Sequence, residues 1–310
     1  MVQTDGKDVI SMRFVSVAEI ADKWQVTERS VRKYCNDGRI EGAVLKGKTW
    51  KIPEDTEKPE RKEKSKKLPN TLLQRLKAEK EERLPGGIYH KIQIDLTYNS
   101  NHIEGSRLTH DQTRYIFETN TIGVEGDIVN VDDIVETANH FSCIDLIIDQ
   151  ANAQLTENYI KQLHRILKSG TSDSRKSWFA VGDYKHNANE VGGLATALPD
   201  EVPGRMKELM AWYKAISHKT FDDLLEFHFR FELIHPFQDG NGRVGRLILF
   251  KECLKHNIVP FIISDDMKLY YYRGLKEWRV EKGYLRETCL MAQDRFKQYL
   301  DYFKIRYEGQ

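Results

Sequence analysis

Residues 54–67 divide the sequence into parts that must fold separately. The stretch, EDTEKPERKEKSKK, has no aliphatic or aromatic residue and mixes both charges with a proline. Because such a run cannot bury apolar surface, it is either a solvated linker or an exposed single helix, and a linker fits better. We therefore expect a small domain over 1–53, a charged linker with a lead-in helix over 54–84, and a large domain over 85–310.

The composition excludes several classes of protein. Hydrophobic residues make up 40% of the chain and charged residues 31%, which favours a globular protein over a disordered one. No run approaches the ~18 to 20 apolar residues of a membrane span. The opening MVQTDGKDVISMRF is polar instead of basic and then apolar, so we expect a cytoplasmic protein without a membrane segment. The four cysteines form no CxxC pair, so we expect reduced, buried thiols and no zinc module.

The first domain has the pattern of a helix, a tight turn and a basic helix. Ser16 and Glu19 have the S-x-x-E spacing of a capping box, which begins the first helix. Thr27 can cap the second helix, over 28–36. That helix carries the basic residues Arg29, Arg32 and Lys33. Two short strands are then expected around a Lys-Gly-Lys turn, with Pro53 ending the second one.

This stretch resembles the excisionase-like and MerR-like winged helix-turn-helix domains. The resemblance rests on Val31–Lys33, Gly38–Ile40 and Trp50–Pro53. It implies DNA binding by the second helix, with Lys46 and Lys48 on backbone phosphates. Residues 1–53 carry ten Lys/Arg and seven Asp/Glu, a local charge of only +3, so a protein-contact role stays open as the alternative.

The large domain is predicted to be helical almost throughout. An apolar pattern predicts a long buried helix over 221–234, and Gly and Pro break residues 179–203 into a small β-hairpin. Pro236 stops the long helix, which presents the His235 imidazole at a turn. A Gly-rich turn then leads into another helix, and such a helix N-terminus is an anion site because its N–H groups are unpaired.

The residues of that turn carry a full motif. HPFQDGNGRVGR, residues 235–246, matches the Fic-domain signature H-x-F-x-(D/E)-G-N-(G/K)-R-x-x-R at every defined position. The resemblance extends over about residues 85–300. It implies a mainly α fold, with an all-helical Fic core and a β-hairpin flap at 179–203. It also implies transfer of AMP from ATP to a Tyr, Thr or Ser hydroxyl of a target protein, with release of pyrophosphate.

The resemblance assigns a role to each motif residue. His235 would be the general base, with an imidazole pKa near neutral. Asp239 would hold Mg²⁺. Phe237 would anchor the loop in the core. The remaining motif residues would bind nucleotide, through backbone N–H groups, the Asn241 side chain and guanidinium groups: Gly240, Asn241, Gly242, Arg243 and Arg246. Arg243 could either contact the ligand or brace the loop, and bracing fits slightly better, whereas Arg246 would clamp the terminal phosphate.

A second family feature precedes the motif. Ser100-Asn101-His102-Ile103-Glu104-Gly105 fits the inhibitory-helix pattern (S/T)-x-x-x-E-(G/N), on a helix expected over about 90–105. By resemblance this is a class II Fic protein, in which Glu104 reaches Arg246 and blocks the productive pose of ATP. The flap would dock the target as an added strand.

Two other functions stay open beside AMP transfer. The chain could be a transcription regulator that uses the Fic domain as a nucleotide sensor. It could also be a bifunctional enzyme in which Glu104 positions a water that removes AMP. Of the three tyrosines at 270–272, at least one is expected in the core. The sequence does not identify the target protein, and it leaves a homodimer open.

Overall fold

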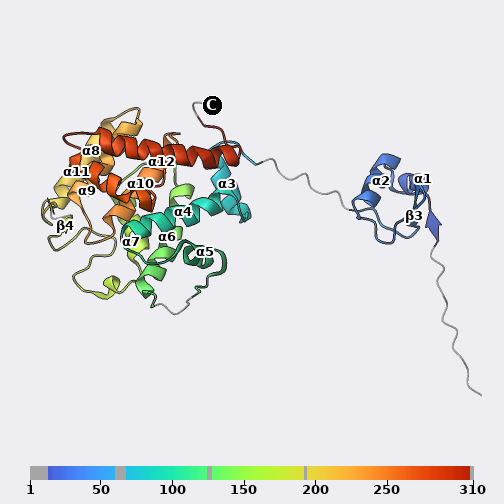
Figure 1. The fold of residues 1–310 in the computed structure, drawn as a ribbon, viewed down its shortest axis with the longest axis horizontal. Helices are drawn as coiled ribbons and strands as arrows, with labels where there is room; N and C mark the ends of the chain where they lie inside the picture. The colour runs from blue at the N-terminus through green and yellow to red at the C-terminus, as the bar shows by residue number, and fades with distance from the viewer. Residues whose placement is uncertain (1–12, 60–67, 124–127, 192–193, 308–310) are drawn as a thin grey trace, which may run out of the picture. The chain divides into compact units, whose positions relative to one another are not determined.

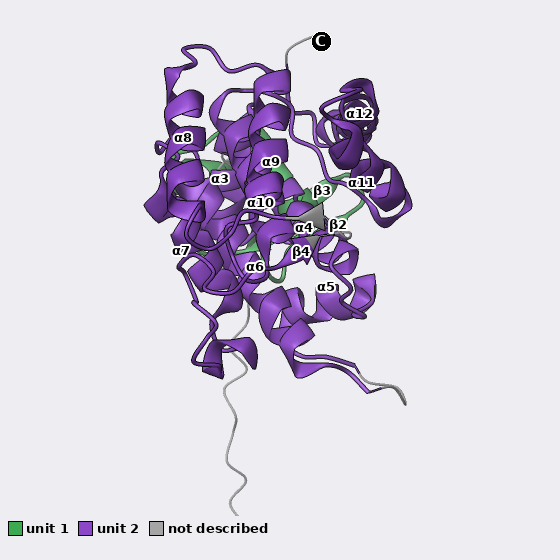
Figure 2. Ribbon diagram, turned by 90° about the vertical axis from the view of Figure 1, so that its left-hand side faces the viewer, with its two compact units in different colours: residues 1–67 green, residues 68–310 purple. Residues whose placement is uncertain are grey.

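A computed structural model describes residues 13–59, 68–123, 128–191 and 194–307. Contacts divide the chain into two compact units, residues 1–67 and residues 68–310, and each is described by itself (Figures 1 and 2). The chain is mainly helical, which confirms the predicted fold class. Of the charged stretch, residues 60–67 lie outside the described part.

Within residues 13–59, the first unit has two helices and a three-stranded antiparallel sheet of order β1-β3-β2. Its elements are β1 (Phe14–Val15), α1 (Val17–Trp24), α2 (Glu28–Asn36), β2 (Val44–Lys46) and β3 (Thr49–Pro53). The capping box of Ser16 and Glu19 is present, and Thr27 caps α2 through the N–H of Ser30, as predicted. Strand β1 is an addition to the prediction, since two residues carry no periodicity.

The described residues of the second unit form a helical assembly with a two-stranded hairpin, β4–β5 (Figure 2). Its helices, apart from two short 3-10 turns, are α3 (Leu72–Glu82), α4 (Ile88–Ile103), α5 (His110–Thr119), α6 (Val131–Asp149), α7 (Glu157–Lys168), α8 (Val202–Ala215), α9 (Phe221–Ile234), α10 (Asn241–Lys255), α11 (Lys268–Glu277) and α12 (Gly283–Tyr302). The hairpin joins β4 (Glu190–Val191) to β5 (Leu194–Ala195). Helix α9 has the predicted bounds, and α3 lies within residues 54–84.

Helix α10 is the centre of this unit. Residues 241–254 are all buried, and the helix contacts α9, α6, α7 and α4. Apolar side chains such as Val244 and Leu247 account for part of that burial, but Arg243 and Arg246 are buried as well. Because a buried charge is costly unless it is paired, these two arginines require partners from the surrounding helices.

Two smaller predictions concern cysteines and tyrosines. All four cysteines are free and buried, as expected. Of the three consecutive tyrosines, Tyr271 is in the core and bonds His228, whereas Tyr270 is exposed. None of the helices in the described ranges combines the length and the apolar character that a bilayer crossing requires.

Candidate active site

The loop after α9 is held in one conformation by its own polar groups. His235 ends α9 in a left-handed conformation with φ +52°, and its N–H donates to the Phe231 carbonyl at 2.9 Å. Phe237 is fully buried and stacks on His164, with ring centroids 4.0 Å apart, which confirms its anchoring role. The Asn241 amide accepts from the Phe237 N–H and donates to the Phe237 carbonyl, both at 2.8 Å. The side-chain donor expected for nucleotide is therefore committed to the loop, because Asn241 is buried against Phe237.

Helix α10 begins directly beyond this loop with no side-chain cap. Gly240 is its N-cap residue, with φ +81°, a conformation that favours glycine. At Gly242 an added Cβ would lie 2.3 Å from Glu104 Oε1, so the glycine makes room for a carboxylate against the first turn of α10. A negative group therefore already sits at this helix N-terminus, where N–H groups and the helix dipole favour one.

That carboxylate comes from the end of α4. Helix α4 ends at Ile103, so Glu104 is its C-cap and lies just beyond the helix instead of within the predicted 90–105. Arg246 donates to Glu104 Oε1 at 2.7 Å, and to the Ser100 hydroxyl and carbonyl at 3.0 and 2.9 Å. Burial alone would lower the pKa of Arg246, but the Glu104 carboxylate raises it above its usual value. The predicted contact between Glu104 and Arg246 is thus present.

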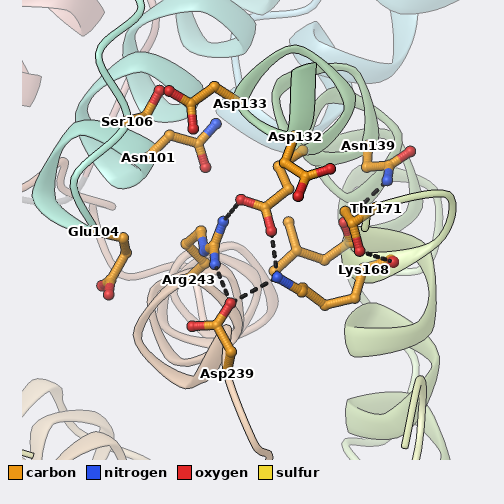
Figure 3. Close-up of polar contacts among 12 residues, drawn as sticks. Asn101, Glu104, Ser106, Asp132, Asp133, Asn139, Lys168, Thr171, Asp239 and Arg243 are labelled. Atoms are coloured by element: carbon orange, nitrogen blue, oxygen red, sulfur yellow. Dashed lines mark hydrogen bonds and ion pairs between the residues drawn. The ribbon is translucent and has the colours of Figure 1, made fainter. Parts of the chain in front are cut away.

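Asp239 belongs to a second ionic cluster, built on α6, α7 and α10 (Figure 3). Its Oδ2 accepts from Lys168 Nζ at 2.7 Å and from Arg243 Nη2 at 3.0 Å. Lys168 and Arg243 also share the two oxygens of Glu136, and Lys168 reaches Asp173 at 3.2 Å. Arg243 is therefore committed to bracing contacts. Burial would raise the pKa of Asp239, but the two cations hold it well below the usual range.

Asp239 has the properties required of a magnesium ligand. Both ion pairs fall on Oδ2, and the other oxygen points away from both cations (Figure 3). The side chain is 48% exposed. Magnesium is usually held by one or two carboxylates together with substrate phosphates. Within the described ranges no three His, Cys, Asp or Glu residues are grouped for a metal, so an ion here would depend on Asp239 and phosphate oxygens.

The His235 imidazole differs from the prediction. Burial, reinforced by the nearby Lys185 ammonium, lowers its pKa to about 4, where a near-neutral value was expected. The physical reason is that a partly closed site disfavours the charged imidazolium. At neutral pH the ring is therefore in the form that accepts a proton, and its Nδ1 is buried without a partner in the part of the chain that the structure describes.

Several residues around the site were not predicted. They are Glu136, His164, Lys168 and Lys185. Lys168 lies in the last turn of α7, where a lysine is ordinarily a solvated residue that complements the helix dipole. The five basic residues predicted in the first unit are exposed there, on α2 and around the β2–β3 turn, and Arg32 is paired with Glu28.

Residues 154–252 match the model of a family described as the Fic/DOC family. The protein adenylyltransferase Fic of Drosophila sechellia is 29% identical over 188 residues, which are 58% of this chain and 36% of that protein. The chain therefore spans about a third of the length of the curated relatives it matches.

Solved structures agree on the fold. A Fic domain containing signaling protein from Bacteroides thetaiotaomicron superposes with a TM-score of 0.55 at 24% identity, covering 75% of this chain and 91% of that one. Fic-1 of Caenorhabditis elegans gives a TM-score of 0.58 at 19% identity, covering 75% and 72%. The motif loop, the α10 N-terminus and the family match lie in the same segment, and we conclude that the chain contains a Fic domain.

Proposed function

We propose that this chain transfers AMP from ATP to a hydroxyl of a target protein. The observation that carries the proposal is the Glu104 carboxylate against Gly242 and Arg246, because it marks a site built for an anion at the N-terminus of α10. The similarity to proteins named protein adenylyltransferase supports a nucleotide as that anion.

In this proposal His235 is the general base. The acceptor hydroxyl attacks the α-phosphorus of ATP and loses its proton to the imidazole, which the depressed pKa keeps unprotonated at neutral pH. The new bond joins the acceptor oxygen to phosphorus, and the bond to the leaving pyrophosphate breaks. Backbone N–H groups of Gly240, Asn241 and Gly242 stabilise phosphate charge, and Arg246 clamps the terminal phosphate. A magnesium ion on Asp239 would neutralise charge on the leaving group.

Glu104 makes this activity autoinhibited in the proposal. While it holds Arg246, the guanidinium is not available to the terminal phosphate, so ATP binds without the productive pose. The alternative role of Glu104 is to position a water that removes AMP from a modified target. Incubation with a target carrying labelled AMP, without ATP, separates the two roles, because only the second one releases AMP.

The base assignment is tested in a Glu104→Gly background, where transfer is expected to be high. His235→Ala should reduce labelling from labelled ATP by at least about a hundredfold, since general bases contribute on that order. ATP binding, measured by calorimetry, should change little. Retained labelling in the His235→Ala variant would show that His235 is not the general base.

Asp239→Asn in the same background should weaken the magnesium dependence of labelling.

DNA binding by the first unit is a second proposed function. The observation that favours it is the exposure of five basic residues on α2 and around the β2–β3 turn: Arg29, Arg32, Lys33, Lys46 and Lys48. Electrostatic contacts of this kind weaken as salt rises, because phosphate contacts release counterions. A gel-shift titration of the full chain at two salt concentrations tests it, and the absence of any salt-sensitive shift favours protein contacts instead.

A further inference from the structure

Three lysines are buried in the described part of the chain, and one of them differs from the others. Lys168 and Lys251 are each ion-paired with carboxylates. Lys185 is only 2% exposed, and its ammonium donates to two neutral oxygens, Asn189 Oδ1 at 2.6 Å and Thr196 Oγ1 at 2.7 Å. No carboxylate of the described residues lies within ion-pair distance of it.

Burying the Lys185 ammonium without a carboxylate partner costs folding free energy. A buried ammonium without a counter-charge loses hydration that neutral acceptors restore only in part. Burial accordingly lowers the pKa of Lys185 to about 8. A methionine of similar length would fill the same space without this cost. A buried lysine at this position therefore suggests a functional role for its charge and its N–H donors.

The lysine joins the two ends of the flap hairpin. Lys185 and Asn189 precede strand β4, and Thr196 follows strand β5. The Thr196 hydroxyl accepts a hydrogen bond from the Lys185 ammonium. It also donates to the carbonyl and the side-chain oxygen of Asn189, at 2.9 and 2.6 Å. The three side chains therefore form a closed polar clasp at the base of the flap.

The same clasp is bonded to the loop that carries His235. The Lys185 N–H donates to the Pro236 carbonyl at 2.9 Å. Asn189 Nδ2 donates to the carbonyls of Phe237 and Gln238, at 3.1 and 3.3 Å. One set of hydrogen bonds thus connects both legs of the flap to the residues directly after His235.

We infer that Lys185 is a positioning residue for the transfer, whose ammonium fixes the base of the flap to the His235 loop. The inference rests on the proposed function, in which the flap docks the acceptor segment as an added strand. A strand docked on a hinged flap would place its hydroxyl at a variable distance from the imidazole, and small misplacements cost large factors in rate. The clasp removes that freedom.

The charge of Lys185 also affects a second measurable quantity, the pKa of His235. Three charged groups act on the His235 imidazole: Lys185 lowers its pKa, and Glu104 and Asp239 raise it. Removing the ammonium should therefore raise the pKa of His235, whereas a purely space-filling role would leave it where it is.

The test compares Lys185→Met and Lys185→Arg in the full chain carrying Glu104→Gly. A matched control is Lys161→Met, because Lys161 pairs with Asp183 at 2.7 Å and lies over the Tyr184 ring, and both partners are outside the motif loop. Self-modification is followed with labelled ATP, flap motion by amide exchange of residues 186–198, and the His235 pKa by imidazole chemical shifts.

Lys185→Met should slow transfer by at least about tenfold with less than about threefold change in the Kd for ATP, because positioning acts on the rate and not on nucleotide binding. Flap amides should exchange faster, and the His235 pKa should rise. Lys185→Arg should restore most of the rate. The Lys161→Met control should have the parent's transfer rate, flap amide exchange and His235 pKa.

Two results would overturn the inference. One is a Lys185→Met protein with the parent's transfer rate, exchange and imidazole pKa. The other is a loss of thermal stability alone. If Lys185→Met does not fold, Asn189→Ala keeps the lysine and should still speed flap exchange. If the parent transfers no AMP, the proposed function fails, while exchange and imidazole pKa still decide the role of Lys185 because neither needs nucleotide.

Discussion

The two units of this chain treat charge in opposite ways. In the described part of the first unit every buried side chain is apolar, around a core that includes Ile20, Val31 and Ile52. The second unit buries Lys168, Lys185, Arg243 and other charged side chains near the motif loop. Buried charge is retained only where partners or function compensate its desolvation, so it locates the chemistry in the second unit. The first unit carries its charge on the surface, where it can meet a partner but not activate a nucleophile.

The largest expected difference between the units is their response to acid. Burial, the first cause in each case, lowers the pKa of His140, His164 and His228 to about 3, and that of His235 to about 4. Each depressed pKa contributes stability that is complete above about 6.5 and is lost as pH falls toward the folded value. Burial raises the pKa of Glu232 to about 8, so the folded protein holds one extra proton there and gains stability as pH falls.

For these five groups together the difference is about three protons, on the order of 4 kcal/mol per pH unit between pH 6.5 and 4.5. The first unit contains no histidine, since all ten lie beyond residue 67. Calorimetry of the full chain at pH 7 and pH 5.5 should therefore show the larger transition moving to lower temperature and the smaller one staying. Equal shifts of both transitions would contradict the comparison.

The next difference is the cost of losing one carboxylate. Glu136 is 13% exposed and pairs with two buried cations, Lys168 and Arg243. Glu136→Gln should lower the free energy of unfolding by about 3 kcal/mol, because it removes the carboxylate that both buried cations share. The matched change in the first unit is Glu28→Gln, where the pair with Arg32 is exposed and worth less than about 1 kcal/mol. Denaturant titrations of both variants measure the two losses in free energy of unfolding. Equal losses would contradict the expected difference between the units.

The smallest effect is expected at the surface of the first unit. Arg32→Ala should weaken duplex DNA binding by about threefold to tenfold and reduce its salt dependence, while leaving AMP transfer unchanged. Gel shifts at two salt concentrations check the first part and labelled ATP the second. A variant that binds DNA like the parent would favour a protein partner for this unit.

The features that could be predicted from sequence are those with local causes. Capping residues such as Ser16 and Thr27 fix helix starts through hydrogen bonds to residues three positions away. The contact of Glu104 with Arg246 was predicted because two short patterns, each recognisable in one segment, belong to the same family. Strand β1 lacked such a signal because two residues have no period.

The features that could not be predicted depend on partners far away in the sequence. Lys168 reaches Asp239 across 71 positions, and a lysine in the last turn of a helix gives no hint of burial. Lys185 lies four positions before Asn189, but its burial and its link to the motif loop arise from tertiary packing. The depressed pKa of His235 has the same origin, since desolvation is a property of the folded site.

In the proposed function, the Glu104 carboxylate holds Arg246 away from nucleotide and so limits AMP transfer. The most direct measurement is the initial rate of self-modification from labelled ATP by the parent and by Glu104→Gly, with Glu104→Gly/His235→Ala as the control. We expect Glu104→Gly to raise this rate by at least about tenfold, equivalent to ~1.4 kcal/mol of barrier, and the double variant to lose the increase. A Glu104→Gly protein that labels no faster than the parent, or more slowly, would contradict it.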